Sequence, residues 1–168
     1  YFYLSSKAIY VPNYADIKRI RFKKDDSPGC PIKILYARRF TNQRGVWLIL
    51  ESARLLKEKG INFHLFMLSP EGQAISVDLI KSKIAELGLS EQVSIINNFD
   101  LDSIYDFYEQ VDISVVPTLW SEGTSYSCIE SIVAGVPVVT TTVGGLPNII
   151  IPDFNGIIEP PIPERLAG

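Results

Sequence analysis

The stretch at residues 112–141, DISVVPTLWSEGTSYSCIESIVAGVPVVTT, switches from a strand pattern to a helix pattern and back. A β-branched run at about 112–116 leads into a polar loop, and apolar residues then recur at helical spacing over about 125–134. A second β-branched run follows at about 136–140. This order predicts a strand, a helix and a parallel strand, because a helix is the usual connection between parallel neighbours.

The same alternation extends towards the N-terminus. Further strands are predicted at about 8–11, 32–37, 62–68 and 92–97, and further helices at about 45–59, 74–87 and 102–110. The helical pattern of 45–59 ends at Gly60, as a helix stop should. The sequence therefore predicts an α/β fold: a Rossmann-like three-layer domain with a parallel sheet of about six strands.

Length and composition limit the organisation. A chain of 168 residues, 46% hydrophobic and 21% charged, is enough for one domain with a substantial core. The polar stretch at about 13–31 is predicted to be a surface excursion, and 160–168 the start of a truncated C-terminal helix. No apolar run approaches the roughly 20 residues of a membrane span.

The charge balance leaves room only for a local anion site. A net charge of -3 gives no general attraction to nucleic acid or to an anionic membrane. The two cysteines, Cys30 and Cys128, lack metal-ligand spacing and weakly favour a reducing compartment. For anion binding, the basic residues of particular loops therefore matter more than the net charge of the chain.

Residues with chemical content follow the predicted strands. Ligands of open parallel sheets bind at the carboxyl ends of the strands, where the loops converge. The loops there contain Arg38, Arg39 and Arg44, then Ser69–Gly72, Asn97-Asn98, Thr118–Ser125 and Thr140–Gly145. We expect these five loops to meet at one edge of the sheet.

The loop before the helix at 125–134 is suited to phosphate. Its small residues precede a helix whose first-turn amides can hold phosphate oxygens. Glu130, inside that helix, could accept hydrogen bonds from a ribose diol, although a solvated helix glutamate is the alternative. Arg39 and Arg44 suit a diphosphate, or form a solvated basic loop. Gly144-Gly145 allow close backbone approach to a bound group, or form a plain turn.

Together these residues resemble the C-terminal, donor-binding domain of glycosyltransferase family 4, which has the GT-B fold. The resemblance runs from Val11-Pro12-Asn13 to Asn155-Gly156 and is carried by a composite of motifs. These are Pro117-Thr118-Leu119-Trp120-Ser121-Glu122-Gly123, Glu130, Ala134-Gly135-Val136-Pro137-Val138-Val139 and Gly144-Gly145.

The resemblance implies a role for each site residue. Glu130 and Glu122, the two glutamates of the family motif, would bind the donor ribose and lie near the transferred sugar. Arg39 and Arg44 would neutralise the diphosphate, and the helix end would meet the phosphates. The full donor-binding set is Arg39, Arg44, Glu130, Thr124, Ser125, Tyr126, Gly144, Gly145, Leu68, Ser69 and Asn98, with Leu68, Ser69 and Asn98 bordering the base.

The implied function is retaining sugar transfer from a nucleoside diphosphate sugar, a UDP- or GDP-sugar, to an acceptor hydroxyl. Glu122 is the implied catalytic residue, with no metal and no other cofactor. The partner is a missing N-terminal acceptor domain, so this chain alone is expected to be inactive. The expected location is cytoplasmic, with any membrane contact through the missing half. A non-hydrolysing sugar-nucleotide epimerase and a regulatory nucleotide-binding module are the alternatives.

Some residues depart from the family pattern or are set aside. Arg38 and Asn148 stand where the family has glycine and glutamate, and the loop after Met67 lacks the usual glycines. Asp100 and Asp102 are expected to cap a helix rather than bind a metal. His64 is predicted to be structural, and Trp120 is expected to pack rather than stack on a sugar.

Overall fold

The computed structural model describes residues 13–23, 29–69, 74–97 and 103–168. Its six strands form one parallel sheet in the order β3-β2-β1-β4-β5-β6. The strands are β1 (Ile32–Ala37), β2 (Phe63–Ser69), β3 (Val93–Asn97), β4 (Ile113–Val116), β5 (Val138–Thr141) and β6 (Gly156–Glu159). The helices are α1 (Val46–Glu58), α2 (Val77–Glu86), α3 (Ile104–Tyr108), α4 (Tyr126–Val133) and α5 (Pro163–Leu166), with a 3-10 turn η2 (Leu146–Asn148).

The predicted fold class is confirmed, with one difference in the sheet. The predicted segments from 32–37 to 136–140 match β1 to β5 and α1 to α4, with ends that agree within three residues. The predicted strand at 8–11 lies outside the described residues. The sixth strand is instead β6, which the sequence analysis missed because only Ile157 and Ile158 are β-branched in it, between a glycine and a glutamate.

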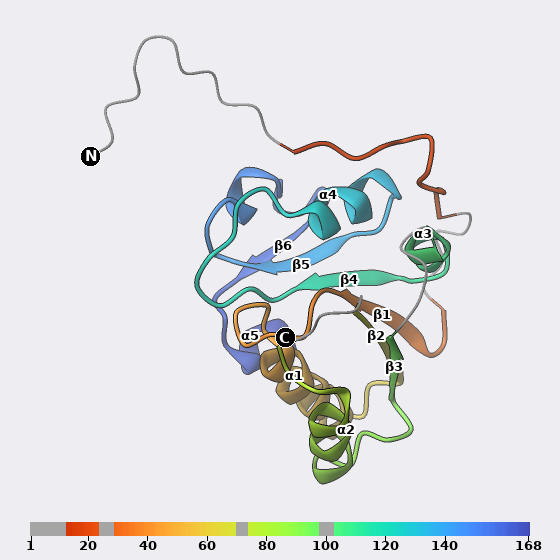
Figure 1. The fold of residues 1–168 in the computed structure, drawn as a ribbon, viewed down its shortest axis with the longest axis vertical. Helices are drawn as coiled ribbons and strands as arrows, with labels where there is room; N and C mark the ends of the chain where they lie inside the picture. The colour runs from red at the N-terminus through yellow and green to blue at the C-terminus, as the bar shows by residue number, and fades with distance from the viewer. Residues whose placement is uncertain (1–12, 24–28, 70–73, 98–102) are drawn as a thin grey trace.

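The sheet separates two layers of helices, as Figure 1 shows, with α1 and α2 on one side and α3 and α4 on the other. Alternation along β1 explains this arrangement, since successive side chains of a strand point to opposite faces. Ile34 and Tyr36 belong to the core cluster beneath α1 and α2. Leu35 and Ala37 belong to the cluster beneath α3 and the end of α4. Both faces are covered, so β1 is apolar throughout its buried part.

The N-terminal segment 13–23 runs along the α3 and α4 side of the sheet. Most of its side chains are exposed, but Ile20 is buried with the core cluster of Leu35. The Lys23 backbone N–H donates to Ala134 O at 3.0 Å, and its Nζ lies 2.8 Å from Asp112. Asn13 Nδ2 donates to Thr124 O at 2.6 Å. These contacts hold the segment beside the loop that precedes α4.

A glycine turn after β5 fixes the position of that loop. Gly144 has a φ of 60°, and a Cβ added there would lie 2.1 Å from the Glu122 carbonyl oxygen. The Gly145 N–H donates to the same oxygen at 3.1 Å. The close approach predicted for this glycine pair was to a bound group, whereas in the structure the pair packs against the chain's own 122–123 loop.

We predict that Gly144→Ala destabilises the domain by about 2 kcal/mol or more. A left-handed φ costs an L-residue roughly 1–2 kcal/mol, and the new Cβ would also collide with the backbone at Glu122. Denaturant unfolding monitored by circular dichroism measures this loss. Gly123→Ala is the matched control, because nothing lies within 4 Å of its added Cβ. Equal stability of the two variants would contradict this account.

Candidate functional site

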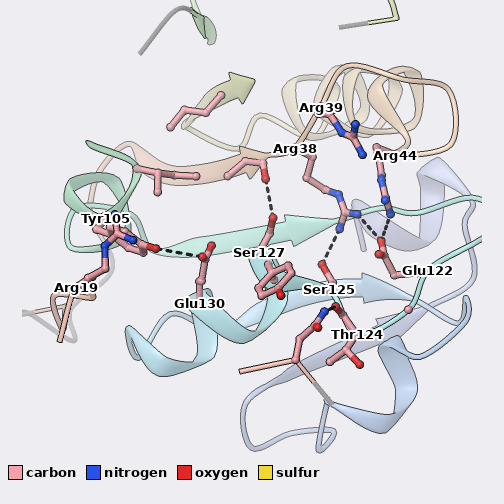
Figure 2. A pocket seen from close by; sticks show the side chains of 16 residues that line it. Arg19, Arg38, Arg39, Arg44, Tyr105, Glu122, Thr124, Ser125, Ser127 and Glu130 are labelled. Atoms are coloured by element: carbon pink, nitrogen blue, oxygen red, sulfur yellow. Dashed lines mark hydrogen bonds and ion pairs between the residues drawn. The ribbon is translucent and has the colours of Figure 1, made fainter. Parts of the chain in front are cut away.

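A pocket of about 770 Å³ opens at the carboxyl ends of the central strands. The β1–α1 loop, the end of β2, the start of α3, the β4–α4 loop and α4 all contribute to it, as does the N-terminal segment. Its lining residues are Asn13, Arg19, Ala37, Arg38, Arg39, Arg44, Leu68, Ile104, Tyr105, Glu122, Gly123, Thr124, Ser125, Tyr126, Ser127 and Glu130 (Figure 2). Of the five loops predicted to converge, the one with Arg38, Arg39 and Arg44 and the one at Thr118–Ser125 meet in this cavity, and none of the described residues of the other three lines it.

The structure brings most of the predicted site residues together. Those that line the pocket are Glu122, Arg39, Arg44, Glu130, Thr124, Ser125, Tyr126 and Leu68. Gly144 and Gly145 do not line it, because they pack behind the Glu122 loop. Ser69 does not line it either: it is buried, and its Oγ accepts a hydrogen bond from Phe40 N at 3.2 Å. Asn98 lies outside the described residues.

Glu122 is the centre of an ion-pair network. Its Oε2 accepts hydrogen bonds from Arg38 Nη2, from Arg44 Nη1 and, at 2.8 Å, from Thr118 Oγ1. Only 6% of its side chain is exposed. Burial opposes ionisation, but the Arg38 charge and the hydrogen bonds from Thr118, Arg38 and Arg44 outweigh it, so the pKa of Glu122 lies below its ordinary value. The carboxylate is therefore ionised at neutral pH.

Sequence reasoning missed several residues that line the pocket, and Arg38 is the one at the centre of the ion-pair network. Its side chain is 5% exposed and also donates from Nη1 to Ser125 Oγ at 3.0 Å. The available signal was its position: an arginine replaces the family's glycine beside two other arginines. Arg38, Arg44 and Glu122 together leave one net positive charge, and Arg39 adds another. The pocket can thus offset a multiply charged anion.

Helix α4 points its N-terminus towards this cluster. No acidic residue lies in its first turn, and Ser125 makes no capping hydrogen bond. Ser127 Oγ donates to Ala37 O at 2.8 Å, which holds the first turn of α4 against the end of β1. The first-turn amides and the helix dipole therefore add to the positive potential of the arginines.

Glu130 lies one turn further along α4 in a different environment. Tyr108 OH donates to its Oε2 at 3.1 Å, and Tyr105 OH donates to its Oε1 at 3.4 Å. Burial raises the pKa of Glu130, although both tyrosine hydrogen bonds and the Arg19 charge oppose that rise. Arg19 Cζ also lies 5.4 Å from the centre of the Tyr105 ring. Glu130 is thus a positioned pocket residue, and the alternative of a solvated helix glutamate is wrong.

Of the residues that the sequence analysis set aside, His64 behaves as expected and Trp120 does not. His64 Nε2 lies 2.8 Å from Ser94 Oγ, and its ring packs on Phe66 at 4.7 Å. Trp120 is 62% exposed, so the packing prediction is wrong. Hydrogen bonds between Gln43 and the backbone on both sides of Trp120 hold this loop. Asp100 and Asp102 fall outside the described residues.

Within 13–23, 29–69, 74–97 and 103–168, no helix is long and apolar enough to cross a membrane. The same part of the chain holds no group of three or more histidine, cysteine or acidic side chains that could bind a metal ion. Cys128 is buried, and burial raises its pKa to about 12, whereas Cys30 is exposed.

Similarity to known proteins identifies the class. The family described as "Glycosyl transferases group 1" matches residues 17–168. The amylovoran biosynthesis glycosyltransferase AmsK of Erwinia amylovora is 25% identical over 85% of this chain and 36% of its own length. A glycosyltransferase structure from Rickettsia africae is 27% identical, with a TM-score of 0.73, over 83% of this chain and 36% of that one.

A third similarity concerns the fold. The structure of HepE from Anabaena in complex with UDP and glucose is 18% identical, with a TM-score of 0.76, over 92% of this chain and 44% of that one. The chain spans about a third of the length of the first two relatives. It belongs to the group 1 glycosyltransferases, and its Rossmann-like domain is one half of a GT-B fold.

The opposite pKa shifts of the two glutamates predict opposite effects on stability. Glu122→Gln should destabilise the domain by about 3 kcal/mol at pH 7, because it leaves two guanidinium groups without their buried partner. Glu130→Gln should leave stability unchanged or raise it slightly, since ionising Glu130 costs free energy that glutamine avoids. Urea unfolding of both variants measures the difference.

The two pKa shifts also predict how the stability of the domain depends on pH. The stabilisation from Glu122 is present above the unfolded pKa of about 4.3 and is lost as the pH falls through the lower folded pKa. The difference in the free energy of unfolding between the wild-type chain and Glu122→Gln should therefore become smaller as the pH falls below 4. For Glu130 the cost of ionisation appears as the pH rises above about 4.3 towards its raised folded pKa. If Glu122→Gln lowers the free energy of unfolding by the same amount from pH 7 to pH 3, Glu122 is not stabilised by the ion-pair network.

Proposed function

We propose that this chain is the donor-binding half of a retaining glycosyltransferase that transfers a sugar from a nucleoside diphosphate sugar to an acceptor hydroxyl. The observation that carries this proposal is the single pocket in which Arg39, Arg44, the α4 N-terminus and Glu130 meet. Membership of the group 1 glycosyltransferases supports sugar transfer. The UDP-bound HepE structure supports a nucleoside diphosphate donor.

The pocket offers groups suited to the ribose and the two phosphates of such a donor. Glu130 can accept hydrogen bonds from the ribose hydroxyls, and the first turn of α4 can bind the phosphate next to the ribose. The arginines at the other end can stabilise the diphosphate as it leaves, because preorganised cations in a partly closed site act strongly on developing charge. The matched charges favour a mechanism in which no metal ion neutralises the leaving group.

The proposed role of Glu122 is electrostatic. Its carboxylate is held by Arg38, Arg44 and Thr118, and its pKa lies below the ordinary value. At neutral pH it has no proton to donate, so it is unsuited to general acid catalysis. It can accept a hydrogen bond from a sugar hydroxyl or stabilise positive charge at the anomeric carbon.

The first test is the affinity of the domain for nucleotides, measured by calorimetric titration. We expect UDP or GDP to bind more tightly than the matching monophosphate, because the second phosphate meets the arginines. Arg39→Ala should weaken diphosphate binding by about tenfold, or about 1.4 kcal/mol. Equal affinities for mono- and diphosphate would rule the assignment out.

Glu130→Gln provides the matched variant at the ribose end. It should weaken nucleoside diphosphate binding and leave inorganic pyrophosphate binding unaffected, because pyrophosphate has no ribose. If both ligands lose affinity equally, Glu130 acts on the phosphates or on the fold instead.

The second test concerns transfer itself. Transfer requires the acceptor hydroxyl to be held about 3–3.5 Å from the anomeric carbon, and we propose that a second domain supplies that wall of the site. With a labelled donor and its acceptor, the full-length protein should turn over in the presence of chelator, retaining the anomeric configuration, and this chain alone should not. Turnover by this chain at the full-length rate, or its abolition by chelator, would overturn the corresponding part of the proposal.

A further inference from the structure

Arg38 is placed as a ligand-binding residue, although the family pattern has glycine at its position. It lines the pocket, yet its side chain is almost fully buried. Hydrogen bonds to Ser125 Oγ and Glu122 Oε2 fix its guanidinium. A guanidinium has more N–H donors than these two bonds use. Arg38 is therefore an ordered cation at the wall of the pocket, and it has N–H groups left to donate to a ligand.

The order of residues along the pocket shows which part of a donor Arg38 would meet. In Figure 2, Tyr105 and Glu130 lie at one end, Ser127 follows, and Arg38 with Ser125 comes before Glu122 and Arg44 at the other end. A nucleotide whose ribose is bound by Glu130 would place its first phosphate beside Ser127. Its second phosphate would then reach Ser125 and Arg38.

We infer that Arg38 binds the second phosphate of the nucleoside diphosphate and is a main determinant of the preference for diphosphate over monophosphate. This inference rests on the proposed function and deepens it, because that function assigns the diphosphate to Arg39 and Arg44. The guanidinium group of Arg38 can bind a phosphate bidentately, through two N–H groups, which a lysine ammonium cannot do.

Arg38 and Arg39 differ in how well their side chains are ordered before a ligand binds. The Arg39 side chain is exposed, so a phosphate that it binds must first order a long flexible side chain. Arg38 is already held by Ser125 and Glu122, so little further ordering is needed. Its loss should therefore cost more diphosphate affinity than the loss of Arg39.

The test is a calorimetric titration of UDP, GDP, UMP and GMP into the wild-type chain, Arg38→Met, Arg38→Lys and Arg39→Ala. Arg38→Met keeps an apolar stem without the charge and should lower diphosphate affinity about a hundredfold, while monophosphate affinity changes less than about threefold. Arg38→Lys should lose less than Arg38→Met. Lys81→Met, on the exposed side of α2, is the charge-removal control and should change neither affinity.

The ratio of diphosphate to monophosphate affinity separates binding from a structural role. An equal loss for both ligands would show that Arg38 only supports the loop, and a gain in diphosphate affinity would show that it blocks the site. Either result overturns the inference. If Arg38→Met does not fold, Arg38→Lys decides: a reduced ratio supports the inference and an unchanged ratio overturns it. No diphosphate binding by the wild-type chain would instead be a failure of the proposed function.

Discussion

The site depends on the buried ion pairs between Glu122 and the two arginines, Arg38 and Arg44. A carboxylate that is removed from water must be paired and hydrogen-bonded, and Arg38 and Arg44 of the β1–α1 loop and Thr118 of the β4–α4 loop meet that requirement. The turn at Gly144 packs closely against the backbone of the same glutamate. The β1–α1 loop, the β4–α4 loop and the turn after β5 are thus fixed relative to one another by a single side chain and its backbone.

This arrangement divides the pocket into two electrostatic halves. At the Glu122 end, arginines exceed carboxylates and the helix dipole adds positive potential. At the Glu130 end, burial raises the pKa of the carboxyl group and two tyrosines donate to it. Anionic phosphate is favoured at the first end and neutral hydroxyls at the second. A nucleoside diphosphate has both features in that order.

The sequence predicted the elements better than their contacts. Strands and helices from 32 to 141 could be predicted because β-branched runs alternate there with helical patterns, whereas β6 has only Ile157 and Ile158 between a glycine and a glutamate. The meeting of the β1–α1 and β4–α4 loops in one pocket followed from parallel topology. The pairing of Arg38 with Glu122 did not, because these residues are 84 positions apart and charge alone does not distinguish a buried arginine from a solvated one. The exposure of Trp120 was missed for a similar reason, since its loop is held by hydrogen bonds to Gln43, a residue distant in the sequence.

The most direct test of the account is a crystal structure of this domain with UDP or GDP bound. The account predicts the diphosphate at the first turn of α4, with its second phosphate within hydrogen-bond distance of Arg38, and the ribose hydroxyls on Glu130. A nucleotide bound elsewhere, or one bound in this pocket with its phosphates at Glu130, would contradict it.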